Sequence, residues 1–183
     1  MTSYEDVAAA VQSARSPTEG RINLAALLAT EAGLSLDDFI VVGGSAIEVH
    51  TVGRYTSGDI DIVSSRSSVL QAILKEWRFE GGPRVWSNGD LGIVVDLVKS
   101  PYTGDITRTT IVTTPFGQFR LAGIEDLLVK RLASTKHWRV PGDFEHAKLL
   151  AGLFKDRIDW SYVRKLAAEY DVEDLLNTLM GIL

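Results

Sequence analysis

Segments of strand character in the middle of the chain most limit the folds open to it. They are residues 39–42, 59–63, 84–86, 91–98 and 109–114, and Asn88-Gly89 between two of them is a strong hairpin signal. Segments of helical periodicity lie on both sides and within this region: residues 3–15, 21–32, 46–52, 65–77, 123–135, 142–154, 159–170 and 172–181. The pattern therefore predicts an α+β fold, with a mixed β-sheet core, flanking helices and a helical C-terminal part.

The sequence changes character near residues 121–123, where strand signals end and helical ones take over. We therefore expect residues 1–122 to form a core with a helical N-terminal leader, and residues 123–183 a helical part. Within the leader, Ser3 with Asp6 reads as a capping pair, residues 16–20 as a break and Gly33 as a helix stop.

Composition excludes several classes of function. The chain has no cysteine, which rules out disulfides and cysteine-based zinc sites or nucleophiles, and its net charge of −5 argues against a protein that coats nucleic acid. No apolar run reaches the roughly 18 residues of a membrane-spanning helix, and the start of the chain has no basic segment typical of a secretory signal. We expect a cytoplasmic protein without membrane association.

Asp59 and Asp61 are two positions apart in a segment of strand character, so their side chains lie on the same face. Two adjacent carboxylates repel each other, and a divalent cation relieves that repulsion. Mg²⁺ binds through one or two carboxylates together with substrate phosphates. The pair suits a metal site, although in isolation an exposed strand face with outward acids is the more common explanation.

Two further features narrow the interpretation. Gly43-Gly44-Ser45 ends the apolar segment 39–42 and opens a helix, so its backbone N–H groups and the Ser45 hydroxyl suit phosphate binding, or Ser45 simply caps the helix. Asp96 is the single acid in the apolar segment 93–98, where a carboxylate is costly without a partner. If that strand lies beside residues 59–63, Asp96 completes a three-carboxylate cluster; otherwise it faces water on an edge strand.

Together these residues resemble the nucleotidyltransferase superfamily with the polymerase-beta-like fold. Residues 54–61, Arg-Tyr-Thr-Ser-Gly-Asp-Ile-Asp, are similar to a stretch of minimal nucleotidyltransferases and AbiEii-like toxin components, with one extra residue between Arg54 and the acids. Residues 113–121 and 123–132 resemble the strand and helix that lead into the helical half of that family. The resemblance covers roughly residues 38–155.

The resemblance implies transfer of a nucleoside monophosphate from an NTP to an acceptor hydroxyl, dependent on Mg²⁺ or Mn²⁺. Asp59, Asp61 and Asp96 would be the catalytic and metal-binding residues. Nucleotide binding would fall to Gly43, Gly44, Ser45, Arg54, Ser57, Lys130 and Arg131. The acceptor is an RNA, a protein hydroxyl or a small molecule, and an antitoxin partner is implied if the chain is a toxin. The alternative is a catalytically silent module of the same fold that binds a nucleotide or a partner.

The helical half leaves its own alternatives open. Arg131 falls on the apolar stripe of residues 124–132, where it either contacts phosphate or pairs with an acid such as Asp143 or Glu145. Residues 136–139, Lys-His-Trp-Arg, either stack on a nucleotide or RNA end or form a solvated helix end with Trp138 partly buried. His146 stands where related toxin-like enzymes carry a further acid.

Overall fold

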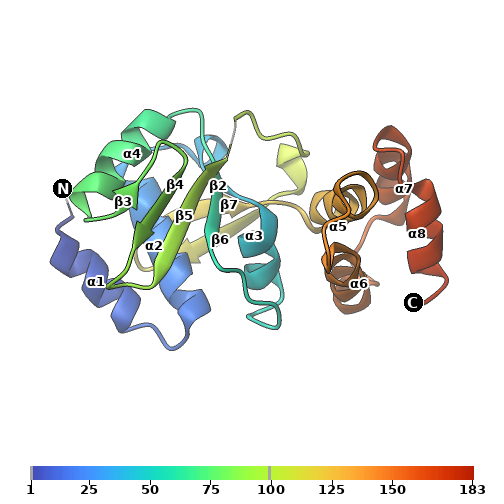
Figure 1. Ribbon diagram of the computed structural model, residues 1–183, viewed down its shortest axis with the longest axis horizontal. Helices are drawn as coiled ribbons and strands as arrows, with labels where there is room; N and C mark the ends of the chain where they lie inside the picture. Colours follow the sequence, from blue (N-terminus) through green and yellow to red (C-terminus); the bar gives the residue numbers. More distant parts are fainter. Residues whose placement is uncertain (1, 99) are drawn as a thin grey trace. The chain divides into compact units, whose positions relative to one another are not determined.

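The computed structural model describes residues 2–98 and 100–183. Its chain divides into two compact units, one ending at Ala122 and one extending from Gly123 to Leu183, and each is described by itself. Within the described residues there are eight α-helices and seven strands, so the α+β expectation is confirmed (Figure 1). None of the helices described is both long and apolar enough to cross a membrane.

The first unit is built on one mixed sheet with the strand order β3-β4-β5-β2-β1-β7-β6. Its elements, in chain order, are α1 (Tyr4–Gln12), α2 (Pro17–Glu31), a 3-10 turn (Leu36–Asp38), β1 (Ile40–Val41), α3 (Gly43–His50), β2 (Ile60–Val63), α4 (Ser67–Glu76), β3 (Glu80–Gly81), β4 (Val85–Asn88), β5 (Ile93–Val98), a second 3-10 turn (Ile106–Arg108), β6 (Thr110–Thr114) and β7 (Gly117–Leu121). The pairs β2–β5 and β1–β7 are parallel, and the other neighbouring strands are antiparallel.

The predicted break at residues 16–20 and the predicted starts of the second and third helices were wrong, and one strand was not predicted. Helix α2 begins at Pro17, because the Ser16 hydroxyl accepts a hydrogen bond from Glu19 N at 3.1 Å and proline is favoured in a first helical turn. Helix α3 begins at Gly43, so the glycine turn is its first turn. Strand β3 was not predicted, because Glu80 and Gly81 are both exposed and carry no apolar pattern.

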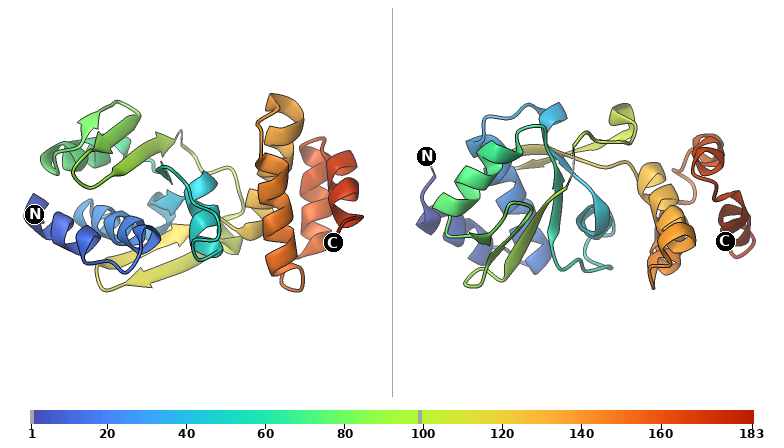
Figure 2. Two further views of the ribbon diagram at one scale, coloured as in Figure 1. Left: turned by 60° about the horizontal axis from the view of Figure 1, so that its bottom comes forward. Right: turned by 45° about the horizontal axis from the view of Figure 1, so that its top comes forward.

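Helix α2 lies along the β6–β7 hairpin, as the two views of Figure 2 show, and supplies much of the apolar layer beneath the sheet. Phe39 and Phe119 meet edge to face in this core, with ring centroids 6.3 Å apart. Trp77 is 1% exposed, and its Nε1 donates to Thr2 O at 3.1 Å. The polar residues of the candidate site gather where β1 leads into α3 and β2 begins, with β5 beside β2.

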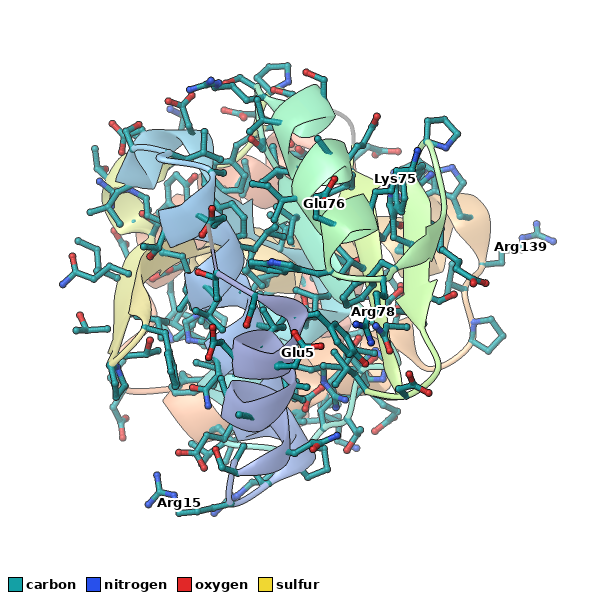
Figure 3. All side chains as sticks on the ribbon, turned by 90° about the vertical axis from the view of Figure 1, so that its left-hand side faces the viewer. Glu5, Arg15, Lys75, Glu76, Arg78 and Arg139 are labelled. Atoms are coloured by element: carbon teal, nitrogen blue, oxygen red, sulfur yellow. The ribbon has the colours of Figure 1, made fainter. Side chains whose placement is uncertain are left out.

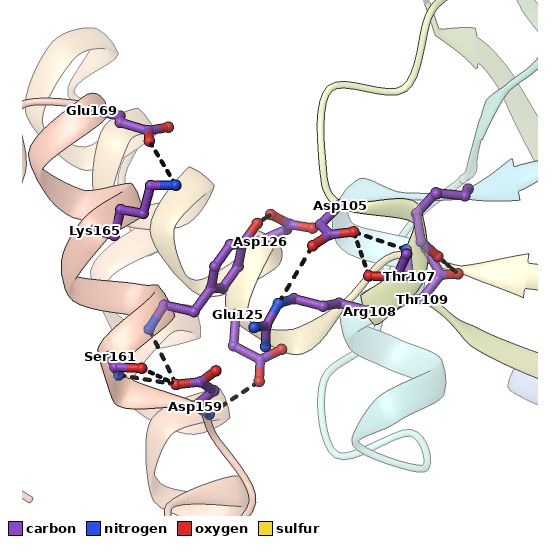
Figure 4. Close-up of polar contacts among 12 residues, drawn as sticks. Asp105, Thr107, Arg108, Thr109, Glu125, Asp126, Asp159, Ser161, Lys165 and Glu169 are labelled. Carbon is purple, nitrogen blue, oxygen red and sulfur yellow. Dashed lines mark hydrogen bonds and ion pairs between the residues drawn. The ribbon is translucent and has the colours of Figure 1, made fainter.

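The second unit consists of helices that agree with the predicted segments. They are α5 (Ile124–Ala133), a π-helical turn (Ser134–Trp138), α6 (Asp143–Phe154), α7 (Trp160–Glu169) and α8 (Glu173–Met180). Asp159 caps α7 by accepting hydrogen bonds from Ser161 N and Tyr162 N, both at 3.1 Å (Figure 4). Its own N–H donates to the Glu125 carboxylate at 3.2 Å, which ties α7 to α5.

Candidate metal centre

Three aspartates converge at the middle of the sheet. Asp61 on β2 and Asp96 on β5 are direct partners in the parallel register, and Asp59 lies just before β2. One carboxylate oxygen from each of the three falls within 4.8 Å of the others. The strand pairing that the sequence left conditional is therefore present, and Asp96 is 8% exposed beside the pair instead of facing water on an edge strand.

In the protein without metal, the negative charges of the three carboxylates repel one another. Burial is the largest cause that raises the pKa of Asp61 to about 6, and the negative charges of Asp59 and Asp96 add to it. Hydrogen bonds from the backbone of Ser45 and Gly44 offset part of this rise. A cation among these carboxylates would remove the repulsion, and an all-oxygen donor set is the one that Mg²⁺ and Mn²⁺ prefer. The residues present therefore fit a divalent ion.

The glycine turn fits tightly against Asp61. Gly44 N donates to Asp61 Oδ2 at 3.0 Å, which places the carboxylate at the N-terminal end of α3. Gly43 has φ of +58°, and a Cβ there would collide with the same oxygen. A Cβ on Gly44 would lie 2.8 Å from Ser57 Oγ. Gly43 therefore allows close approach by the chain's own acid, and Gly44 allows close approach by Ser57, besides any approach to phosphate.

Ser45 has a different position from the one that its sequence context suggested. It is buried, its hydroxyl donates to Val42 O at 2.9 Å, and the hydroxyl oxygen accepts from Asp61 N at 3.0 Å. Because its proton is already donated within the chain, the structure gives Ser45 a bracing role between α3 and β2. Direct contact with phosphate remains only a prediction for this residue.

Glu48, a buried acid that the sequence did not predict as part of the site, contacts the residue that holds Asp59. Glu48 on α3 is 1% exposed, and its carboxylate accepts from Arg21 Nη2 at 2.7 Å, Thr18 Oγ1 at 2.6 Å and Ser57 N at 2.7 Å. Ser57 Oγ in turn donates to Asp59 Oδ1 at 2.9 Å. Ser57 thus connects Glu48 to the aspartate cluster. The signal in the sequence was an acid between Ile47 and Val49 on an apolar helix.

Arg84 was also missed. It lies directly before β4, whose first residue, Val85, pairs with Asp96. Its guanidinium binds both oxygens of Asp96: Nε lies 2.6 Å from Oδ1 and Nη2 lies 2.6 Å from Oδ2. The hairpin signal at Asn88-Gly89 could not have placed Arg84 near Asp96. A two-residue turn there would pair Asp96 with residue 81, whereas the observed loop spans residues 89–92 and pairs Val85 with Asp96.

Arg54 lies on an exposed loop after α3, where its backbone N–H donates to Thr51 O at 3.2 Å. Across residues 2–98 and 100–183, the structure shows no contact between its side chain and the three aspartates. Its proposed contact with nucleotide therefore stays a prediction from the resemblance.

In the second unit, Arg131 forms an ion pair with an acid, which is one of the two alternatives that the sequence allowed. Its Nη1 lies 2.8 Å from Asp143 Oδ1, which also lies 3.1 Å from His146 Nδ1. Lys130 is mostly buried, and this burial lowers its pKa while the nearby Asp126 carboxylate opposes the shift. Nucleotide binding by Lys130 and Arg131 stays a prediction. To bind phosphate, Arg131 would either use its remaining N–H groups or give up the ion pair with Asp143.

The basic-aromatic segment 136–139 is held by helix α8 and the turn before it. Lys136 Nζ lies 3.0 Å from an oxygen of Asp174, and His137 Nε2 lies 2.9 Å from Tyr170 O. Trp138 is 71% exposed, which contradicts the alternative in which the segment is a helix end with Trp138 partly buried. The left-handed backbone of Arg139 ends the π-helical turn and leaves the indole outside the helix packing.

Comparison with known proteins gives the family. Residues 22–178 match the model of a family described as a nucleotidyltransferase of unknown function (DUF6036). A search of curated proteins and a search of solved structures found no match to the chain. The narrower similarity to AbiEii-like toxin components is not confirmed. The family match covers most of the chain, including both the aspartate cluster and the helical unit, and the chain therefore belongs to this nucleotidyltransferase family.

Proposed function

We propose that the protein transfers a nucleoside monophosphate from an NTP to an acceptor hydroxyl and needs Mg²⁺ or Mn²⁺ to do so. The observation that supports this most directly is the convergence of Asp59, Asp61 and Asp96, whose ligand oxygens lie within 4.8 Å of one another. The glycine turn at the N-terminus of α3 contacts Asp61, so a backbone segment suited to phosphate lies next to the acidic cluster.

Each residue has a role in this proposal. Asp59 and Asp61 would hold the cation against the triphosphate, and Asp96 would bind a second cation or activate the acceptor hydroxyl. Gly43, Gly44 and Ser45 shape the turn that receives the phosphates. When bound, the cation neutralises charge on the phosphoryl oxygens. The acceptor oxygen forms a bond to the α-phosphorus as the bond to the β-bridging oxygen breaks, so pyrophosphate leaves. The hydroxyl proton passes to Asp96 or to water.

The test is transfer of label from each α-³²P-NTP, with Mg²⁺, into total RNA, protein and small-molecule fractions. Asp59→Asn and Asp61→Asn should abolish transfer and leave folding intact. Asp90→Asn is the matched control, because Asp90 is an exposed acid on the β4–β5 turn. Lack of labelling in every pool, together with lack of Mg²⁺-dependent binding of all four nucleotides by folded protein, would refute the proposal.

The acceptor class follows from which pool is labelled, since the structure describes the three aspartates and not the acceptor. The silent-module alternative predicts a different outcome: metal-dependent nucleotide binding in calorimetry without label in any pool. An antitoxin partner remains a prediction of the sequence resemblance. Co-purification with the product of an adjacent gene, with suppression of growth arrest by it, would support that part.

A further inference from the structure

Arg84 and Asp96 form a two-point ion pair at the edge of the aspartate cluster. Both donor–acceptor distances are 2.6 Å, and the side chain of Asp96 is 11% exposed whereas that of Arg84 is 66% exposed. Such a fork fixes the orientation of the carboxylate as well as its charge. Arg84 therefore reaches the cluster from its solvent side and holds the one aspartate that is most enclosed.

The same carboxylate belongs to the group that could hold a metal ion. A guanidinium that takes both oxygens of Asp96 and a divalent cation that takes one of them are like charges competing for one anion. Hydrogen bonding and charge attraction from Asp96, followed by the charge of Asp61, raise the pKa of Arg84. Arg84 is thus attracted by Asp61 as well as by Asp96, and it already supplies one positive charge beside the cluster.

We propose that Arg84 is an exchangeable counter-ion of Asp96, which holds the carboxylate in the metal-free protein and releases it when a divalent ion binds. This inference rests on the proposed function, because it takes the three aspartates as metal ligands. Arg84 is a positioning residue in this scheme, because it acts through Asp96 and keeps that carboxylate directed at the cluster until the metal binds.

The first test is calorimetric titration of the full chain with Mn²⁺. Arg84→Gln should lower the melting temperature of the metal-free protein, because the three acids lose their cation. It should also tighten Mn²⁺ binding by about tenfold, because a competing positive charge is gone. Arg84→Lys keeps the positive charge but cannot form the two parallel hydrogen bonds. Its melting temperature and Mn²⁺ affinity should lie between those of the wild type and Arg84→Gln. A purely structural ion pair would lower stability without tightening metal binding.

Arg78→Gln is the matched control. Arg78 belongs to the same unit, is 62% exposed and pairs with Glu5 at 3.1 Å, so the substitution changes the net charge equally (Figure 3). Its Mn²⁺ affinity should equal that of the wild type. If Arg78→Gln tightens binding as much as Arg84→Gln, the effect is one of overall charge and the inference is wrong.

The second test follows the guanidinium directly. Phenylglyoxal modifies accessible arginines, and peptide mass spectrometry gives a rate for each of them. The rate at Arg84 should rise several-fold on addition of Mn²⁺, while that at Arg78 in the same digest stays constant. An unchanged or lower rate at Arg84, in protein that binds Mn²⁺, would overturn the exchange. If neither the wild type nor Arg84→Gln binds Mn²⁺, the proposed function fails and the exchange with it.

Discussion

The backbone N–H of Gly44 donates to the carboxylate of Asp61 at 3.0 Å, so the first turn of α3 and the acid of β2 are joined before any ligand arrives. This hydrogen bond connects two elements that are separated by a loop in the sequence. It couples the position of the Asp61 carboxylate to the backbone of residues 43–45. A change in either should therefore alter metal affinity.

Gly43→Ala should impair both stability and metal binding. The left-handed backbone at φ +58° costs an alanine about 1–2 kcal/mol, and the added Cβ would collide with Asp61 Oδ2. Gly33→Ala is a close control, because Gly33 has φ of +59° with nothing within 4 Å of its added Cβ. Urea unfolding should show a loss in both variants, whereas Mn²⁺ affinity should fall only in Gly43→Ala. Equal affinities in the two variants would contradict the close fit.

Glu48→Gln should destabilise the first unit by about 3 kcal/mol, because it leaves Arg21 buried without its counter-charge. It should also weaken Mn²⁺ binding, since Ser57 loses the carboxylate that holds its N–H and then positions Asp59 less well. Denaturant unfolding and calorimetry measure the two effects. Glu5→Gln breaks an exposed pair and should cost less than about 1 kcal/mol with unchanged metal affinity.

The metal-free protein should lose stability, relative to Asp61→Asn, as the pH rises. The folded pKa of Asp61 is about 6, above its ordinary 3.8, so folding favours the protonated acid. Its contribution is complete below about pH 4 and is lost as the pH rises through 6, amounting to at most about 3 kcal/mol. Urea unfolding of both proteins between pH 4 and 7 tests this. Saturating Mg²⁺ should remove the difference, and a gap that does not vary with pH would contradict it.

Asp143→Asn should loosen the second unit, because Arg131 loses its buried partner, at a cost of about 3 kcal/mol. Hydrogen exchange should accelerate in α5 and α6. Glu145→Gln is the control: it removes an acid from the same first turn of α6, but that side chain is 69% exposed and pairs with Lys148 at 3.5 Å. If both variants exchange alike, the effect comes from the helix dipole and not from the Arg131 pair.

Much of the fold could be predicted because the patterns involved are local. The alternation of Asp59 and Asp61 with isoleucines, the apolar segment around Asp96 and the periodicity of residues 124–132 each depend on neighbours a few positions away. The same holds for the capping of α1 by Ser3 and for the left-handed Gly33 just after the end of α2. By contrast, β3 was missed because two exposed residues carry no such pattern.

The residues that complete the candidate site were set by tertiary contacts. The sequence by itself determined the acids and the glycine turn, because a charge in an apolar strand and a Gly-Gly pair are unusual wherever they occur. Only the structure decided that β5 lies beside β2, that Arg84 holds Asp96, and that Glu48 reaches Ser57. These partners lie 9 to 35 residues apart. Burial in the assembled core, and not local propensity, determines which charges must pair.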